Sequence, residues 1–305
     1  MDSRYSTPDG QCRTPRSAAS GVPLTLQEAY AYCLDLARHH CENFPVASRM
    51  LPGALRKPVA VIYAFARHGD NLADEGQMTP AERLCELASL EARLDLLKVG
   101  ALVNDPLFLS LKDVIERHRL PLQPFYDLLQ AFRMDVRKKR YAHFGELMEY
   151  CRYSANPIGR LLLFLFGVSN PRHRSYADAL TSAVQIIDHV HDMGEDYEKR
   201  GRIYLPQEDM DRLGVSEEHI RDRRSDEALH NLVALQLNRA EHLLETAAPL
   251  CRTLKGRIGL ETRLIYFGAK RMLHLLRRRA DPFDTLRLNQ RDWGWIAWKA
   301  LWRFS

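Results

Sequence analysis

The sequence has few of the features that would divide it into separate units or place it in a membrane. It has 305 residues with only 16 glycines and 15 prolines, and no Pro- or Gly-rich linker interrupts its middle. The longest apolar stretch, residues 161–168, is far shorter than the roughly 20 residues that cross a bilayer. The N-terminal arginines are not followed by an apolar run, so a secretory signal is not expected. These absences favour one soluble globular unit.

Other absences narrow the class of protein further. The six cysteines are scattered without a CxxC pair, which argues against a zinc knuckle or a disulfide framework and favours a reducing cytoplasm. Alternating apolar and polar residues between tight turns are nearly absent, so strands are not expected. The net charge of +5 is modest. No basic stripe with interleaved aromatic residues is present, so nucleic acid is not an expected partner.

Helical patterns fill nearly all of the chain after a short leader. Residues 1–22 are rich in Ser, Pro, Arg and Gly without periodicity, which predicts a disordered leader. Residues 23–305 are predicted to form one all-α domain, beginning at the capping-box spacing of Thr25 and Glu28. Helices are expected over 25–36, 58–75, 79–98, 107–118, 122–138, 144–151, 155–167, 175–199, 226–254, 257–278 and 290–303.

Two groups of aspartates carry the main chemical signal. Asp70 and Asp74 are four residues apart, so a helix presents both carboxylates on one face, although one such pair alone is most simply a solvated acidic surface. Asp188, Asp192 and Asp196 repeat this spacing among apolar residues, and buried carboxylates must be paired or bind metal. Two such helices facing each other would offer the hard oxygen ligands that Mg²⁺ prefers. The sequence therefore predicts a metal–diphosphate site.

Basic and aromatic residues fit the same scheme. A departing diphosphate needs cationic partners, and Arg49, Arg67 and Arg202 are candidates, with an ordinary ion pair as the alternative for each. His189 and His191 accompany the second aspartate group, but histidines two residues apart point to different sides of a helix, which disfavours zinc. Aromatic residues that would line a hydrophobic channel, or else belong to the core, are Phe44, Tyr63, Phe132 and Phe164.

These residues lie in blocks that resemble the squalene/phytoene synthase family. In chain order the blocks are residues 63–75, 132–136, 150–160, 185–196 and 202–209. The resemblance covers about residues 25–300. Residues 41–49 and 154–157 most resemble the bacterial hydroxysqualene synthase branch of that family, which works in the hopanoid pathway.

The resemblance implies a single-domain, isoprenoid synthase-type helical bundle with a central active-site cavity. It implies a carbon–oxygen lyase that converts presqualene diphosphate and water into hydroxysqualene and diphosphate, using Mg²⁺ (or Mn²⁺) and no NADPH. One alternative is a condensing prenyltransferase that makes presqualene diphosphate, squalene or phytoene from farnesyl or geranylgeranyl diphosphate. The other is an inactive assembly or scaffold protein, which the retained aspartates disfavour.

The resemblance also implies roles for individual residues. The expected metal ligands are Asp70, Asp74, Asp188, Asp192 and Asp196. The expected catalytic residues are Asp70, Asp74, Asp192 and Asp196, together with Tyr63 and Tyr204, which would steer the cation or the water. The expected substrate-binding residues are Phe44, Ser48, Arg49, Arg67, Asn156, Gln185, Asp188 and Arg202. Asn71, Asp188 and His191 depart from the family pattern, which leaves the metal count and the fine choice of substrate open.

The C-terminal segment holds all four tryptophans, and Trp295, Trp298 and Trp302 are expected on one helical face. One interpretation is that this helix docks on the core. The other is an interfacial helix at anionic lipid, which would make a cytoplasmic protein peripheral at the inner face of the cytoplasmic membrane. A water-insoluble product favours the membrane, and direct handover to pathway enzymes is the alternative.

Overall fold

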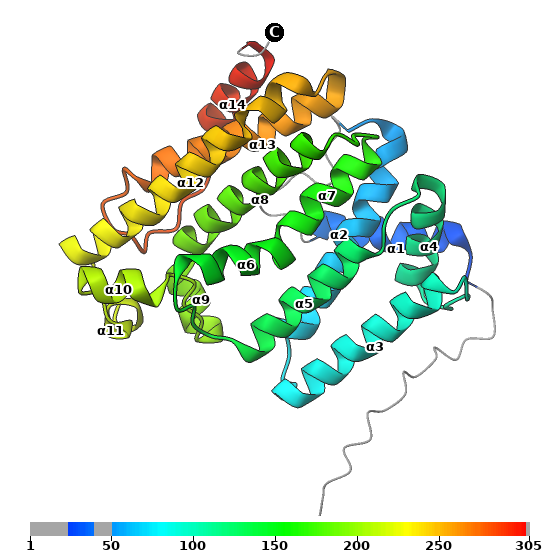
Figure 1. Ribbon diagram of the computed structural model, residues 1–305, viewed down its shortest axis with the longest axis horizontal. Coiled ribbons are helices and arrows are strands. Elements are labelled where there is room, and N and C mark those ends of the chain that lie inside the picture. Colours follow the sequence, from blue (N-terminus) through cyan, green and yellow to red (C-terminus); the bar gives the residue numbers. More distant parts are fainter. Residues whose placement is uncertain (1–23, 40–50, 303–305) are drawn as a thin grey trace, which may run out of the picture.

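The computed structural model describes residues 24–39 and 51–302, and helices dominate both ranges. In these ranges the helices are α1 (Leu26–His39), α2 (Gly53–Asp74), α3 (Pro80–Lys98), α4 (Pro106–His118), α5 (Gln123–Arg137), α6 (Phe144–Ser154), α7 (Asn156–Leu165), α8 (Pro171–His191), α9 (Met193–Arg200), α10 (Gln207–Leu213), α11 (Glu217–Arg221), α12 (Glu227–Thr253), α13 (Gly256–Leu276) and α14 (Gln290–Trp302) (Figure 1). The all-α prediction is confirmed here. The predicted leader, residues 1–22, and the predicted site residues Phe44, Ser48 and Arg49 lie outside the described ranges.

Local capping explains where several of the helices begin. The Thr79 hydroxyl accepts the Glu82 backbone N–H at 3.3 Å, and the Glu82 carboxylate accepts the Thr79 N–H at 2.8 Å. Thr25 and Glu28 make the same reciprocal pair before α1. Such caps satisfy backbone N–H groups that have no partner within the helix.

The single helix predicted over 175–199 is wrong. The chain breaks at Asp192, which has φ −100° and ψ 9° and separates α8 from α9. A Cβ at Gly194 would lie only 3.1 Å from the ring of Phe283, so α9 begins against a loop from the far end of the chain. Sequence periodicity carries no information about that contact. The start of α2 also differs, because Gly53 begins the helix and Pro58 lies within it.

Two hydrophobic clusters meet at α7, which places Leu161 and Leu165 in one and Leu163 in the other. One is built on α2, α3, α4 and α5, where the ring of Phe65 packs edge-on against Phe108 and Phe125. The other joins α8, α12 and α13. In Figure 1, α8 runs through the middle, with α12 and α13 on one side and α7, α6 and α5 on the other. The two aspartate groups lie at the end of α2 and at the junction of α8 and α9.

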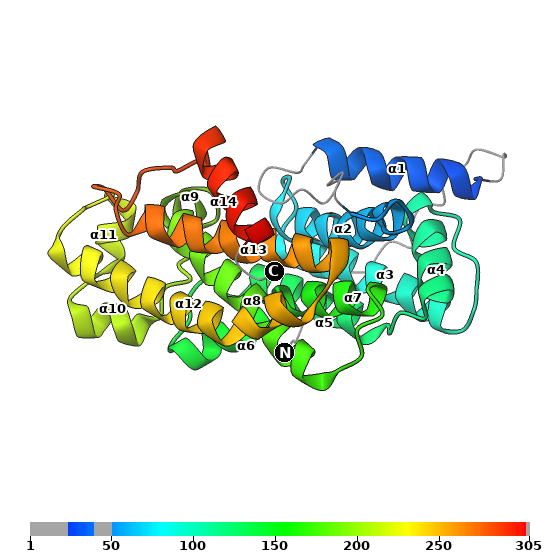
Figure 2. The ribbon, with the colours of Figure 1, turned by 90° about the horizontal axis from the view of Figure 1, so that it is seen from above.

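Helix α14 lies on α13 at the surface of the molecule (Figure 2). Arg263 donates to the Ala300 carbonyl at 2.7 Å, and Arg271 pairs with the buried carboxylate of Asp292. Trp295 packs on the core, whereas Trp298 and Trp302 are 54% and 71% exposed. The helix therefore docks on the core through one face, and the membrane interpretation of its exposed face stays a prediction.

The sequence predicted no membrane-spanning helix and cysteines that are not in a disulfide framework. No described helix combines the length and the apolar character needed to span a bilayer. Cys33, Cys151 and Cys251 are buried free thiols. Cys85, however, is disulfide-bonded, which corrects the expectation of fully reduced cysteines. The spacing of cysteines in a sequence does not show which distant segments approach each other in the fold.

Candidate active site

The two aspartate groups approach each other through arginines. Asp70 and Asp74 occupy the last two turns of α2, and Asp196 lies in the first turn of α9. The Nε of Arg200 is 2.8 Å from a carboxylate oxygen of Asp74, and its Nη1 is 3.3 Å from Asp196. Arg200 therefore pairs with both Asp74 and Asp196, so the segments that carry the two aspartate groups face each other. Their catalytic and metal-binding roles stay predictions.

Arg202 holds Asp74 from a second side. Its guanidinium forks the Asp74 carboxylate, with Nη1 at 2.8 Å from one oxygen and Nη2 bonded to the other. Nη2 also donates to the backbone carbonyl of Asp135 at 2.9 Å, while the buried Nε has no partner. A predicted metal ligand and a predicted phosphate clamp are therefore ion-pair partners. A divalent cation at Asp74 would release arginine N–H groups that can bind phosphate oxygens.

Arg67 makes the corresponding contacts at Asp70. Its Nη1 lies 2.8 Å from the Asp70 carboxylate and its Nη2 lies 2.8 Å from Glu75. The Nε of Arg67 is buried without a partner, although the guanidinium remains partly exposed. Arg67 therefore lies beside the first aspartate pair, as expected from the sequence.

Burial and mutual repulsion disfavour charge on several of these carboxylates. Burial, followed by the neighbouring Asp192 carboxylate, raises the pKa of Asp188 to about 7. Burial also raises the pKa of Asp196 to about 7, with the Asp192 charge adding to it and Arg200 opposing it. Burial and Asp74 raise the pKa of Asp70. Crowded carboxylates of this kind gain from a bound cation, whose positive charge reverses the penalty.

The donor set fits Mg²⁺ in chemistry, although the present side-chain positions do not form a closed site. Within residues 24–39 and 51–302, no three His, Cys, Asp or Glu side chains are gathered closely enough to hold a metal ion. The available donors are carboxylate oxygens on facing segments, which is the ligand type that Mg²⁺ takes together with water and phosphate. Arginine charges balance Asp74 here, so metal binding would require those guanidinium groups to move.

Two extended segments, the one after α5 and the one after α9, pair with each other and hold Arg202 and Tyr204 beside the aspartates. The Ile203 N–H donates to the Lys139 carbonyl at 3.0 Å, within an isolated bridge to Arg140. The Gln207 N–H then donates to the Tyr141 carbonyl at 2.8 Å. These bonds hold the chain after α9 against the chain after α5, which explains why a loop can position buried site residues.

A buried polar network behind Arg202 was not predicted as part of the site. The hydroxyls of Tyr204 and Tyr150 each donate to the Asp135 carboxylate at 3.0 Å. Burial raises the pKa of Asp135 to about 7, against the opposing effect of Arg202. Asp135 and Tyr150 lie within the motif blocks that carry the family resemblance, so the signal was present without a role. Asp135, an aspartate on the apolar face of a predicted helix, was the sequence feature that could have identified this network.

His189 links that network to the substrate-facing residues. Its ring stacks on Tyr204 with centroids 3.7 Å apart, and its Nε2 is 3.3 Å from the side-chain amide nitrogen of Gln185. Burial lowers the pKa of His189 to about 3, so the ring is neutral at physiological pH and can accept from that amide.

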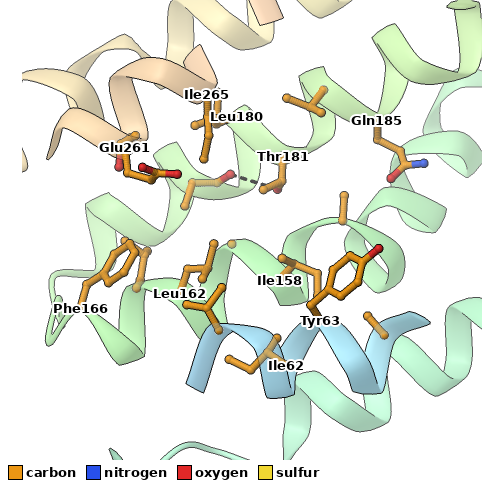
Figure 3. Close-up of a pocket in the computed structure, with 18 of the residues that line it drawn as sticks. Ile62, Tyr63, Ile158, Leu162, Phe166, Leu180, Thr181, Gln185, Glu261 and Ile265 are labelled. Carbon is orange, nitrogen blue, oxygen red and sulfur yellow. Dashed lines mark hydrogen bonds between the residues drawn. The ribbon is translucent and has the colours of Figure 1, made fainter. Parts of the chain in front are cut away.

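An apolar cavity of about 390 Å³ runs up to these residues between α2, α7, α8 and α13. Figure 3 shows Tyr63 and Gln185 toward one end, and Phe166 and Glu261 toward the other. Asp188 also lines the cavity, so the apolar space reaches the second aspartate group. An elongated hydrocarbon fits such a space with its polar head beside the carboxylates and arginines.

Asn156, which was expected to bind substrate, does not line this cavity, and neither do two of the aromatic residues for which channel and core were both left open. Asn156 is buried behind the cavity lining, where its side-chain oxygen accepts hydrogen bonds from Thr181 and Ser182, both at 2.9 Å. Phe132 belongs to the core, and Phe164 is 46% exposed, so neither lines this cavity. Phe166, the residue after the end of α7, lines the cavity and was not singled out in the sequence.

Comparison with known proteins agrees with this geometry. The family model described as Squalene/phytoene synthase matches residues 37–294. A hydroxysqualene synthase of Rhodopseudomonas palustris is 36% identical over 247 residues, covering 81% of this chain and 82% of the relative. A phytoene synthase of Mycobacterium tuberculosis is 33% identical over 190 residues, covering 62% of this chain and 61% of the relative.

Solved structures show the same arrangement of helices. The squalene synthase HpnC from Alicyclobacillus acidocaldarius superimposes with a TM-score of 0.77 at 33% identity, covering 84% of this chain and 96% of that one. A dehydrosqualene synthase in complex with a ligand gives a TM-score of 0.80 at 26% identity, with coverages of 90% and 96%. The helical fold expected from the sequence is confirmed by these two neighbours.

Proposed function

The chain belongs to the squalene/phytoene synthase family, whose members are enzymes, and from this premise we propose that it is a Mg²⁺-dependent hydroxysqualene synthase. The proposed reaction converts presqualene diphosphate and water into hydroxysqualene, diphosphate and a proton, as part of squalene and hopanoid biosynthesis. Hydroxysqualene synthases from three bacteria match this chain at 31–36% identity, which supports this choice within the family.

One observation carries the proposal. The apolar cavity reaches Asp188 and Gln185, and the aspartate–arginine cluster stands at the same end. A substrate with a long apolar body and a diphosphate head would satisfy both parts, since the carboxylates can hold a divalent cation and the guanidinium groups can bind phosphate oxygens. A short polar substrate would leave most of the cavity without a partner.

The polar end of the site and the apolar cavity would have different roles in the reaction. Asp70, Asp196 and the other aspartates would hold Mg²⁺, which when bound would supply charge neutralisation for the leaving diphosphate. Arg200 and Arg202 would transfer part of their pairing from Asp74 to phosphate oxygens. The apolar cavity would exclude bulk water from the carbocation that remains, while a single water near the polar end attacks it and loses a proton.

Tyr63 and Gln185 would orient that water. Both line the cavity near its polar end, opposite each other in Figure 3. Tyr204 lies behind them, with its hydroxyl committed to Asp135, so its contribution would be to position Arg202 and His189. NADPH has no part in this reaction, because water captures the cation.

The proposal is tested by product identity. Purified protein with Mg²⁺ is incubated with presqualene diphosphate, and separately with farnesyl diphosphate, each with and without NADPH, and products are identified by gas chromatography and mass spectrometry. Hydroxysqualene from presqualene diphosphate, independent of NADPH, is the expected result. Formation of no alcohol from presqualene diphosphate by folded protein would overturn it.

A condensing prenyltransferase is the second candidate, because phytoene synthases also match the chain at up to 33% identity. Such an enzyme would share the aspartate–arginine cluster and consume farnesyl or geranylgeranyl diphosphate in the same assay. An inactive scaffold role would leave every substrate unchanged while the protein still folds. The retained aspartates favour catalysis.

We also propose that α14 brings the protein to the cytoplasmic face of an anionic membrane. Trp298, Leu301 and Trp302 are more than half exposed, and the ammonium of Lys299 lies 4.7 Å from the centroid of the Trp298 ring. Exposed tryptophan beside a cation suits the headgroup region of a bilayer. Flotation with liposomes containing anionic lipid should recover the wild type but not Trp298→Ser/Trp302→Ser; equal flotation would favour handover to a partner enzyme.

A further inference from the structure

The break between α8 and α9 is covered by the loop that joins α13 to α14, residues 277–289. Arg279 donates from Nη2 to the Val190 carbonyl at 3.0 Å and from Nη1 to the Asp284 carbonyl at 3.2 Å. The ring of Phe283, which is 8% exposed, packs at Gly194 on the other side of the break. The loop is therefore bound to the chain on both sides of Asp192.

His191 stands between this loop and the Asp192 carboxylate. Its side chain is 14% exposed, and its Nδ1 is hydrogen-bonded to Oδ1 of Asp192. On the opposite edge of the ring, the Leu286 N–H donates to Nε2 at 3.1 Å, and the Leu286 carbonyl oxygen is 3.0 Å from the same nitrogen. Both ring nitrogens are thus engaged by parts of the chain that are far apart in the sequence.

The direction of the Asp192 contact does not depend on the charge of the ring. In the neutral ring, the Leu286 N–H fixes Nε2 as an acceptor, so the proton is on Nδ1 and points at Asp192. In the charged ring, Nε2 can donate to the Leu286 carbonyl while Nδ1 still donates to Asp192. His191 therefore holds one carboxylate oxygen, and the Asp192 side chain stays 38% exposed for another partner.

We propose that His191 is a positioning residue: held by the backbone of Leu286, it orients the Asp192 carboxylate toward the diphosphate site. In the sequence, His191 was notable only as a departure from the family pattern. In the structure, its ring contacts both the backbone of Leu286 and the Asp192 carboxylate. The inference rests on the proposed function in one respect, which is that Asp192 acts as a metal ligand. Residues that hold a metal ligand typically contribute 10–100-fold in affinity.

Metal affinity, rather than turnover, tests this role. Mn²⁺ is titrated into the protein with and without inorganic pyrophosphate, and free Mn²⁺ is followed by electron paramagnetic resonance. His191→Leu should bind Mn²⁺ about tenfold more weakly or worse. His191→Asn should recover much of the affinity, because its amide nitrogen takes the place of Nδ1, whereas His191→Gln places its amide nearer Nε2 and should recover little. His242→Leu, at a histidine whose side chain is 83% exposed, is the matched control.

The outcomes separate this inference from the proposed function. Equal affinity of wild type and His191→Leu, with Mn²⁺ bound by both, would overturn the positioning role and leave the metal site standing. If the leucine variant does not fold, equal affinity of the asparagine and glutamine variants would overturn it in the same way. Absence of Mn²⁺ binding by the wild type would remove the metal site itself, and the inference with it.

Discussion

Arg202 is the residue on which the balance of buried charge at the site depends most. Its side chain is 4% exposed, it forks the Asp74 carboxylate, and its Nη1 lies 3.8 Å from Oδ1 of Asp135. Replacing Arg202 by methionine keeps a long apolar stem but removes the positive charge from between two buried carboxylates. Arg200 would remain paired with Asp74, while Asp135 would retain only its two tyrosine hydroxyls.

The expected loss of stability follows from these contacts. Removing one partner of a buried ion pair costs about 3–5 kcal/mol. Because Arg200 still compensates Asp74, we expect the lower end, about 3 kcal/mol. In a chain of this size that corresponds to a fall in Tm of about 5–8 °C.

The loss should also depend on pH. Burial already raises the folded-state pKa of Asp135 to about 7, and Arg202 opposes that rise. Without Arg202 the folded pKa goes higher still. A folded carboxyl with a raised pKa binds its proton more tightly than the unfolded one, so the protein is more stable at low pH. The variant should therefore lose less stability at pH 6 than at pH 8.

Thermal unfolding followed by circular dichroism at both pH values measures the effect. Arg221→Met is the control, because Arg221 is half exposed and pairs with its neighbour Asp222, so its replacement should leave Tm nearly unchanged. A fall in Tm for Arg202→Met no larger than the control, or one equal at both pH values, would refute the account of the buried network.

Three further predictions concern other parts of the site. Asp196→Asn should raise the Tm of metal-free protein at pH 8, since burial penalises the charged carboxylate, yet lower kcat by orders of magnitude; near-normal turnover would contradict its role. Gly69→Ala should destabilise the protein by about 1–3 kcal/mol, because the new methyl overlaps the Phe132 ring, whereas Gly53→Ala, with open space around it, should not; urea denaturation compares the two. Phe166→Ala should raise the kcat/KM ratio of longer over shorter isoprenoid diphosphates by about tenfold, and an unchanged ratio would show that another residue limits chain length.

Much of the fold could be predicted because local signals and tertiary packing agree. The Thr25 capping box and the apolar faces of the long helices predicted bounds close to those observed. The short helices α10 and α11 could not be found this way, since seven and five residues are too few to show a helical period. The break at Asp192 depends on Phe283 and Leu286, which are about 90 residues away in the chain.

The site was predictable in its charges but not in its pairings. The aspartate spacing identified the acidic segments, and the arginines that were expected near phosphate do lie beside them. Nothing in the spacing indicated that Arg202 would bind Asp74 in the absence of ligand. Asp135 and Tyr150 were missed because a buried hydrogen-bond network joins α5 and α6 with a loop, and its members are recognisable only when their partners are known.

The uneven polarity of the cavity has a kinetic consequence. In the proposed reaction its polar end would bind a diphosphate, whereas the rest of its lining is mostly apolar, with Glu261, at the far end, and Thr262 among the polar exceptions. After diphosphate has left, no ionic contact holds the apolar product in the cavity. Its transfer into water is nevertheless unfavourable, because apolar surface would be exposed. Departure of the product into an aqueous buffer should then be the slow step of the cycle, and a pre-steady-state burst should vanish when lipid or detergent is present to receive it.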